Sequence, residues 1–378
     1  MENTEVKNEP IKSGGGVGFS APLEQKTNRD SGIELFRIIT MLLIVAHHYV
    51  VNSGLLSFIN ADPLSGNSLF LLLFGAWGKT GINCFVLITG YFMCKSNITL
   101  KKFLKLLLEI EFYKIVFYFI FLITGYEPFS LKGLVKAFLP IYNVGTGFTS
   151  CYLLFFLFIP FLNILIQNMN KQQHLLLIAL CSFVYIIIGT VPKFSVTMNY
   201  VSWFIVLYFI ASFVRIYPIA LFSNRKIWGI LAVSVFIVSA LSVVCCAWLG
   251  TKLNQDGFAF YFVADSNKIL AVATAFCAFM FFKNVHFECK FINKVASAAF
   301  GVLLIHANSD TMRRWLWGDL LNNVGQFTSK LGKLAIHAIG SVLAIYIVCT
   351  VIDLIRIYLI ERPFFKVLDK KLFHKKQD

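Results

Sequence analysis

Three ionisable side chains with helical spacing occur in the first apolar segment of the sequence. Glu34, Arg37 and His48 all lie in the stretch IELFRIITMLLIVAHH. An α-helix turns 100° per residue, so Arg37 and His48, eleven residues apart, differ by only about 20° in azimuth. Glu34 lies one turn before Arg37 on the same face, whereas His47 lies about 80° away on the flank. The spacing therefore predicts one polar line, with His48 about 16 Å beyond Arg37.

His48 is the member of this line that suits proton transfer, because imidazole gains or loses a proton near neutral pH. Ionisable groups are costly inside membrane spans, usually face the bundle interior and often mark a functional site. A simpler interpretation is also open, in which Glu34 and Arg37 extend to the membrane surface and His48 ends a helix. The line predicts a polar interior site, but it does not specify a reaction.

The elements that must position these residues are apolar helices. The chain has 378 residues, of which 58% are hydrophobic and 14% charged, with a mean hydropathy of +0.73. This apolar content exceeds what one soluble core buries and indicates an all-α, polytopic membrane bundle. Windows of about 20 residues predict ten spans, near 33–54, 69–93, 103–124, 149–168, 174–191, 199–216, 227–249, 268–283, 294–308 and 334–360. The segment 130–145 is amphipathic and is expected to lie on the membrane surface or to dip into it.

The net charge of +15 does not indicate nucleic-acid binding. Lys and Arg gather in short clusters between apolar runs, as the positive-inside rule describes. The loop 55–68 contains neither residue, and the main outer cluster is Arg313, Arg314, Lys330 and Lys333. We therefore expect a multi-pass protein of the cell membrane with both termini cytoplasmic. The nine cysteines lie mostly in apolar runs, which favours buried apolar side chains over disulfides or metal ligands.

The domain organisation expected from this pattern is simple. Residues 1–30 contain SGGGVGFS and are predicted to form a disordered cytoplasmic tail. Residues 31–366 form one membrane domain, and residues 367–378 form a basic cytoplasmic tail.

Several segments resemble the membrane acyltransferase 3 family. The family's first helix has Arg, ten residues and then His, which matches Arg37 and His48. GINCFVLITGYFM (81–93) is similar to the second-span pattern of the family, TLKKFLKLL (99–107) to the basic start of the third span, and ERPF (361–364) to the usual close. Further segments, including GVLLIHANSDTMRRWLW (301–317), follow in the family's order, so the resemblance covers roughly residues 29–365.

The resemblance implies an integral membrane O-acyltransferase. Members of the family transfer acyl groups, usually acetyl, to hydroxyls of cell-surface carbohydrate outside the cytoplasm. The donor is acyl-CoA, here expected to be acetyl-CoA from the cytoplasm, which acts as a co-substrate; no permanently bound cofactor or metal is expected. Membrane lipid and a carbohydrate acceptor are the expected partners. The acceptor glycan, the acyl group and the oligomeric state stay open.

Particular residues fit the needs of such a reaction. Lys101, Lys102 and Lys105 could attract the donor's phosphates at the cytoplasmic mouth, although they also fit a purely topological role. Arg37 is a better single candidate for a donor contact. His48 is the candidate base or acyl carrier. Glu34 and His306 complete the set of candidate catalytic residues. His306 could meet His48 as a second proton carrier or as a sugar contact, or it could simply end a helix.

Two other functional classes, a transporter and a membrane sensor, also fit part of this sequence pattern. A transporter or flippase for glycan intermediates also needs a polar interior, but it favours inverted repeats, and none is clear in the sequence. A membrane sensor without catalytic activity leaves the alignment of Glu34, Arg37 and His48 unexplained. In the outer loop, Asp256 and Asp265 could contact sugar or simply be solvated. The acyltransferase interpretation explains the most residues.

Overall fold

The structure, a computed structural model, describes residues 30–142, 144, 147–194 and 196–372. Nearly all of the predicted tail 1–30 and the last six residues of the tail 367–378 lie outside these ranges. No strand occurs in the part of the chain that the structure describes. The α-helices in chain order are α1 (Ser31–Val51), α2 (Leu55–Ala61), α3 (Gly66–Gly75), α4 (Gly78–Met93), α5 (Leu100–Ile123), α6 (Leu131–Phe138), α7 (Phe148–Asn168), α8 (Lys171–Ser182), α9 (Tyr200–Ile216), α10 (Arg225–Leu253), α11 (Ile269–Lys283), α12 (Lys290–Ala296), α13 (Ala299–His306), α14 (Asp310–Arg313), α15 (Asn323–Gln326), α16 (Leu331–Arg356) and α17 (Arg362–Leu372).

In the described part of the chain, five short helical segments of other types join these helices. They are the π-helical η1 (Phe183–Ile188), η4 (Arg314–Leu320) and η5 (Ile357–Glu361), and the 3-10 turns η2 (Ala220–Ser223) and η3 (Phe258–Phe260).

The fold is a helical membrane bundle. Each of the ten predicted segments falls on helix. Among the described residues, six helical stretches, fewer than the ten predicted spans, are long and apolar enough to cross a membrane: Ser31–Val51, Gly66–Met93, Phe148–Asn168, Lys171–Ile188, Arg225–Leu253 and Leu331–Lys370. A seventh is added if the pair Lys290–His306 and Asp310–Gln326, bent by 93°, counts as one span. The helices α9 and α11 are apolar but shorter, with 17 and 15 residues.

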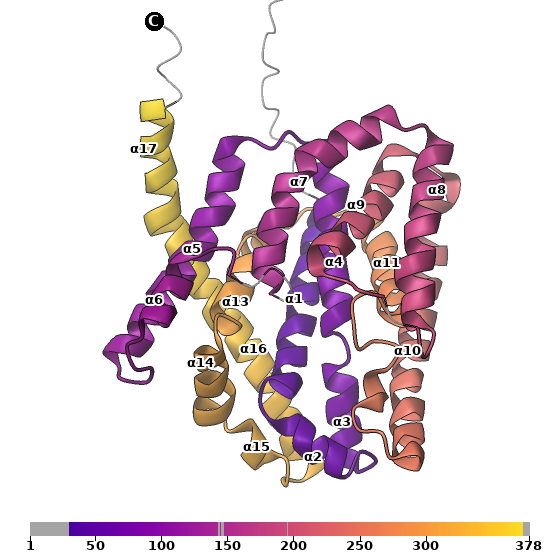
Figure 1. Cartoon of the computed structure of the whole chain (residues 1–378), viewed down its shortest axis with the longest axis vertical. Helices are drawn as coiled ribbons and strands as arrows, with labels where there is room; N and C mark the ends of the chain where they lie inside the picture. Colours follow the sequence, from indigo (N-terminus) through magenta and orange to yellow (C-terminus); the bar gives the residue numbers. More distant parts are fainter. Residues whose placement is uncertain (1–29, 143, 145–146, 195, 373–378) are drawn as a thin grey trace, which may run out of the picture.

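Helix α1 lies at the centre of the bundle and packs against α3, α4, α11, α12, α13 and α16 (Figure 1). Its first turn is fixed by the side chain of Asp30, which accepts a hydrogen bond from the backbone N–H of Gly32 at 3.0 Å. A Cβ atom at Gly32 would lie 1.7 Å from the carbonyl oxygen of Val285, so only glycine allows this close approach to the loop after α11. The start of α1 is therefore held tightly.

Three glycines bring α3 and α4 close to the second half of α1. Cβ atoms at Gly75, Gly78 and Gly81 would lie 2.8 Å or less from side-chain atoms of Val50, His47 and Ile44, respectively. The residue numbers of the partners on α1 decrease in steps of three while those of the glycines increase, because α1 runs antiparallel to the segment that contains α3 and α4. Small residues at such a contact let helix backbones approach closely in a membrane. This contact fixes the rotation of α1 and hence the directions of its histidines.

The described ends of the chain lie at one end of the bundle, at the top of Figure 1, while α2 and α15 lie at the opposite end. We refer to these as the terminal end and the α2 end. Helix α1 runs from the terminal end to the α2 end, so Arg37 lies nearer the former and His48 nearer the latter. The last helix, α17, continues the chain to Leu372, well into the predicted basic tail.

The predicted amphipathic segment 130–145 contains the short helix α6, which packs against α5. Its side chains Leu131, Val135 and Phe138 are exposed, as expected for a helix whose apolar face contacts lipid. Lys114 of α5 donates a hydrogen bond to the carbonyl oxygen of Leu139, at the end of α6. Because Lys114 lies well inside α5, α6 turns back along α5 from the loop between them. Residues 143, 145 and 146 lie outside the described part of this segment.

Candidate active site

Two histidines from distant parts of the chain meet near the α2 end of the bundle. His48, in the last turn of α1, and His306, the last residue of α13, are joined by a hydrogen bond of 2.9 Å between Nδ1 of His48 and Nε2 of His306. His306 is buried, with 1% of its surface exposed, whereas His48 is partly exposed. The two side chains that were predicted at a similar depth are thus in direct contact, and His48 is the more accessible of the pair.

The hydrogen bonds of this pair determine which ring nitrogens carry protons. Nδ1 of His306 lies 2.6 Å from the carbonyl oxygen of Val302, which can only accept, so this nitrogen is the donor. In neutral His306 the Nε2 atom is then an acceptor, and Nδ1 of His48 must donate to it. Nε2 of His48 consequently carries a free lone pair. This is the tautomer that a general base or a nucleophile requires.

His47 has a different partner and a different structural role. Its Nδ1 atom lies 2.6 Å from the carbonyl oxygen of Gly75, at the end of α3 where the chain breaks before α4. The ring also packs against Gly78, where a side chain would overlap it. His47 therefore ties α1 to the break between α3 and α4, while His48 contacts α13.

Two cationic side chains lie close enough to His48 to act on it electrostatically. Lys79 of α4 bonds to the hydroxyl of Tyr200 at 2.7 Å and lies 3.4 Å from Asp265. Arg313 of α14 pairs with the exposed Asp310 at 3.1 Å, and its Nε atom is buried without a hydrogen-bond partner. Fixed cations beside a reacting carbonyl stabilise the negative charge that forms on its oxygen. The sequence placed Arg313 only in an outer basic cluster and gave no sign of this proximity.

The other members of the predicted polar line lie toward the terminal end. Arg37 is partly exposed and forms an ion pair of 3.7 Å with Glu34, one turn earlier in α1. Glu34 itself is buried, with 6% exposed. Arg37 also acts electrostatically on Tyr152 of α7, whose hydroxyl bonds to Thr89 at 3.0 Å. The structure does not bring Glu34 or Arg37 into contact with the histidine pair; they form a separate polar group on the same helix.

The three predicted mouth lysines lie in the first turns of α5, and two of them are paired with carboxylates near the end of the chain. Lys101 is 2.7 Å from Asp369 of α17, and Lys105 is 2.7 Å from Glu361 of η5. Lys102 instead bonds to two neutral oxygens, those of Ser96 and Asn97, at 2.6 and 2.9 Å. Of the three, Lys102 alone keeps a charge that no carboxylate of the described residues neutralises.

The comparison with protein families decides the class. Residues 30–354 match the family model described as an acyltransferase domain. The chain belongs to the membrane acyltransferase 3 family. Neither the curated proteins nor the solved structures contain a significant match to it. The protein is therefore a membrane acyltransferase, as the resemblance of its motifs predicted.

The acyltransferase also contains a buried charge cluster that was not predicted. Arg356, at the end of α16, bonds to Glu109 of α5 at 3.0 Å, to Asp353 at 2.7 Å and to Glu361 at 2.9 Å. The hydroxyl of Tyr113 donates to Asp353 at 2.8 Å. An Asp and an Arg three residues apart in an apolar helix were the available signal, because such a pair shares one face and is costly in a membrane unless it has partners.

A π-helical segment makes one of these contacts possible. Residues five apart in an α-helix differ by about 140° in azimuth, so Arg356 and Glu361 would point apart. In η5 the wider turn, with bonds from residue i to i+5, brings the two side chains to one side. Glu361 belongs to the ERPF motif, so the closing motif of the acyltransferase anchors α16 to the start of α5 through Arg356 and Lys105.

Proposed function

We propose that this acyltransferase transfers acetyl from cytoplasmic acetyl-CoA to hydroxyls of a cell-surface glycan on the other side of the membrane. The observation that carries the proposal is the hydrogen-bond chain from Val302 through His306 to His48. It leaves the lone pair of His48 Nε2 available at the α2 end. The positive charge pattern favours the α2 end as extracytoplasmic and the terminal end as cytoplasmic.

The proposed reaction needs one base and one site of anion stabilisation. Nε2 of His48 takes the proton of an acceptor hydroxyl, and the hydroxyl oxygen attacks the carbonyl carbon of the thioester. The resulting tetrahedral oxyanion lies near Arg313 and Lys79. The carbon–sulfur bond then breaks, the ester leaves with the acceptor, and the CoA thiolate receives the proton from His48. His306 holds the imidazole of His48 in the required tautomer, and it supports the imidazolium that forms transiently.

The donor would enter at the terminal end. The polyanionic part of acetyl-CoA needs cations, and its long flexible arm must carry the thioester toward His48. Lys102 is the best placed of the three lysines for the phosphates, since the charges of Lys101 and Lys105 are neutralised by carboxylates. Arg37 is the second candidate, because it is partly exposed and its ion pair with Glu34 is longer, at 3.7 Å. Glu34 orients Arg37 through their ion pair. The donor phosphates would have to displace Asp369 and Glu361 to use all three lysines.

The test compares surface glycans from cells with and without the gene by mass spectrometry. We expect loss of an acetyl ester from one class of glycan on deletion, and its return with the wild-type gene but not with His48→Ala. In purified protein, acetyl-CoA binding should persist in the His48→Ala variant because Arg37 and Lys102 are intact. Glycans that keep all their esters after deletion would contradict the proposed function.

A further inference from the structure

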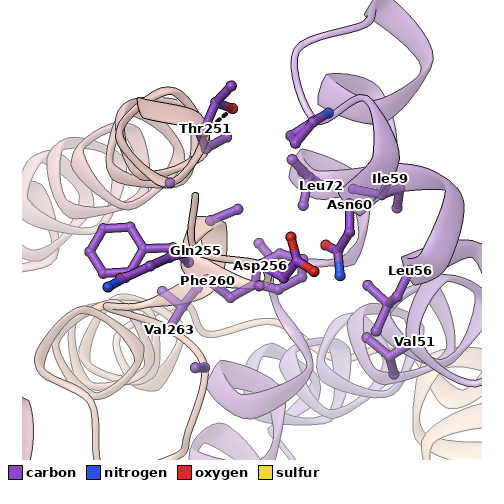
Figure 2. A pocket seen from close by; sticks show the side chains of 18 of the residues that line it. Val51, Leu56, Ile59, Asn60, Leu72, Thr251, Gln255, Asp256, Phe260 and Val263 are labelled. Atoms are coloured by element: carbon purple, nitrogen blue, oxygen red, sulfur yellow. Dashed lines mark hydrogen bonds between the residues drawn. The ribbon is translucent and has the colours of Figure 1, made fainter. Parts of the chain in front are cut away.

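A cavity of about 570 Å³ lies at the α2 end (Figure 2), and its lining includes His47, the chain neighbour of His48. One wall is made by α2, α3 and the start of α4, and the other by the end of α10 and the turn that leads into η3. This turn folds back tightly on α10, because a Cβ atom at Gly250 would lie 2.9 Å from Phe258 and 3.0 Å from the carbonyl oxygen of Gln255. The volume is that of a typical small-molecule site.

Three polar side chains face this cavity with unused hydrogen-bonding capacity. Asn60 of α2 and Asp256 of the turn point into it from opposite walls, and Gln255 lies beside Asp256 (Figure 2). Within the described ranges, none of these three side chains forms a hydrogen bond or an ion pair. The surrounding wall is largely apolar and includes Leu56 and Phe260. Such a mixture of apolar wall and convergent polar groups is characteristic of ligand sites.

The charge balance restricts the chemistry of the ligand. Lys79 reaches the cavity wall, but its charge is balanced by Asp265. His47 donates from Nδ1 to Gly75, so its other ring nitrogen is an acceptor. Together with the carboxylate of Asp256, these groups give an excess of acceptors and one uncompensated negative charge. A ligand rich in hydroxyl donors fits this lining, whereas an anionic ligand is repelled.

We propose that this cavity binds an uncharged, hydroxyl-rich sugar unit of the acceptor, next to the unit that is acylated. The inference rests on the proposed function and adds the charge class of the glycan and the place where it binds. His47 and Lys79 connect the cavity to the reacting base, since both line its wall and both act electrostatically on His48. Sugar rings present hydroxyls at their edges and C–H groups on their faces, which matches the polar groups and the apolar wall.

The first experiment fills the cavity. Thr251→Trp places a large side chain at a lining position of α10, and Leu253→Trp places the same side chain in the same turn, on an exposed residue that does not line the cavity. We expect Thr251→Trp to lower the ester content of surface glycans at least about tenfold, because displacement of a bound substrate by an ångström has effects of that size or larger. Acetyl-CoA binding to the purified protein should be unchanged. Leu253→Trp reports any general effect of tryptophan on folding.

The second experiment tests the charge class through Asp256. Asp256→Ala should raise the glycan concentration needed for half-maximal acylation about tenfold, with deacetylated surface glycan as the probe. Asp256→Asn should restore most of the affinity, since an amide still accepts hydrogen bonds from hydroxyls. An Asn variant as weak as the Ala variant would instead indicate an amine-bearing sugar and overturn the uncharged class.

The outcomes separate this inference from the proposed function. Wild-type ester content in Thr251→Trp cells, with full loss in His48→Ala cells, would overturn the cavity as acceptor site and leave the proposed function intact. A wild-type chain that adds no ester to any surface glycan would overturn both.

Discussion

At the residue scale, the neighbouring residues His47 and His48 have different roles, because their hydrogen-bond partners differ. His48 Nδ1 donates to His306, whereas His47 Nδ1 donates to the carbonyl oxygen of Gly75. Both histidines lie at nearly the same depth, so depth alone does not distinguish them. Both rings keep a lone pair on Nε2, but their surroundings differ. The ring of His48 is held by His306 and is acted on by both Arg313 and Lys79, whereas His47 is held by a backbone carbonyl and is acted on by Lys79 without Arg313.

We therefore predict that His48→Ala reduces acetyl transfer by about a hundredfold or more, the usual contribution of a positioned acid–base group. His48→Gln should be equally inactive, because an amide cannot take the proton at neutral pH. His47→Ala should keep more activity than either variant. Turnover is measured with purified protein, acetyl-CoA and deacetylated glycan. An inactive His47→Ala together with an active His48→Ala would contradict the assignment of the base.

His306 is a positioning residue, and its variants should differ according to whether they preserve an acceptor for His48. His306→Ala removes the acceptor and should lower turnover at least about tenfold while donor binding is kept. His306→Asn retains an acceptor oxygen and should recover part of the activity. Equal losses in the Ala and Asn variants would indicate a packing role, because His306 also contacts Trp317 edge-on at 6.4 Å.

Sequence reasoning located the residues of one helix better than the contacts between helices. The azimuth of α1 separated His48 from His47, because helical geometry is local. The pairs Lys101–Asp369 and Lys105–Glu361 join residues more than 250 positions apart, and no local pattern encodes such contacts. The proximity of Arg313 to the histidines has the same origin, since it follows from the bend after His306.

At the element scale, the cluster around Arg356 ties α5, α16 and η5 together. Two cations, Arg356 and Lys105, face three carboxylates. Both α5 and α16 were predicted as helices from their apolar content. The π-helical segment η5 was not, because a widened turn depends on side-chain contacts and not on hydrophobic periodicity. The break between α3 and α4 was likewise hidden within one apolar segment, 69–93.

Removing the central guanidinium should destabilise the bundle. Arg356→Ala leaves Glu109, Asp353 and Glu361 buried together without their shared cation, a change that typically costs about 3–5 kcal/mol. Arg356→Lys should recover only part of this, because an ammonium cannot reproduce three separate guanidinium contacts. Thermal unfolding in detergent micelles measures the effect. Arg362→Ala, which removes an arginine stacked on Tyr358, is the matched control and should unfold near the wild-type temperature.

The contact between α17 and α5 should oppose donor binding. Asp369→Ala frees Lys101 for the phosphates and should tighten acetyl-CoA binding up to about fivefold at low salt, the range of exposed ion pairs. Lys102→Ala should weaken binding, and both effects should shrink at high salt. Calorimetric titration at two salt concentrations measures these changes. If Asp369→Ala, Lys102→Ala and the wild type bind acetyl-CoA with the same affinity, the lysines do not bind the donor and serve only to set the membrane topology.

At the scale of the whole molecule, the arrangement of the ends agrees with the charge pattern. The described ends of the chain lie at one end of the bundle, and α2 lies at the other (Figure 1). Composition alone predicted a helical membrane bundle. The number of spans is harder to predict, because α9 and α11 are short and the pair Lys290–His306 and Asp310–Gln326 bends by 93°.

The orientation can be tested by labelling with a membrane-impermeant maleimide. Asn60→Cys should react from outside intact cells, and Ile98→Cys should react only after the membrane is permeabilised, because the lysine clusters favour the α5 start as cytoplasmic. The exposed Cys245 is replaced by serine in both proteins to lower the background. Reaction of both positions from the same side would contradict the proposed orientation.

The close contact between Gly78 and His47 has a consequence for the evolution of this protein. A Cβ atom at position 78 would lie 2.2 Å from the ring of His47, a separation that no small adjustment relieves. Position 78 therefore cannot change before position 47: an alanine at 78 is tolerated only after residue 47 has become smaller, whereas residue 47 can change while Gly78 is kept. Among descendants of a common ancestor, we expect every substitution of Gly78 to be accompanied by a residue smaller than histidine at position 47, whereas a change of residue 48 does not remove this clash.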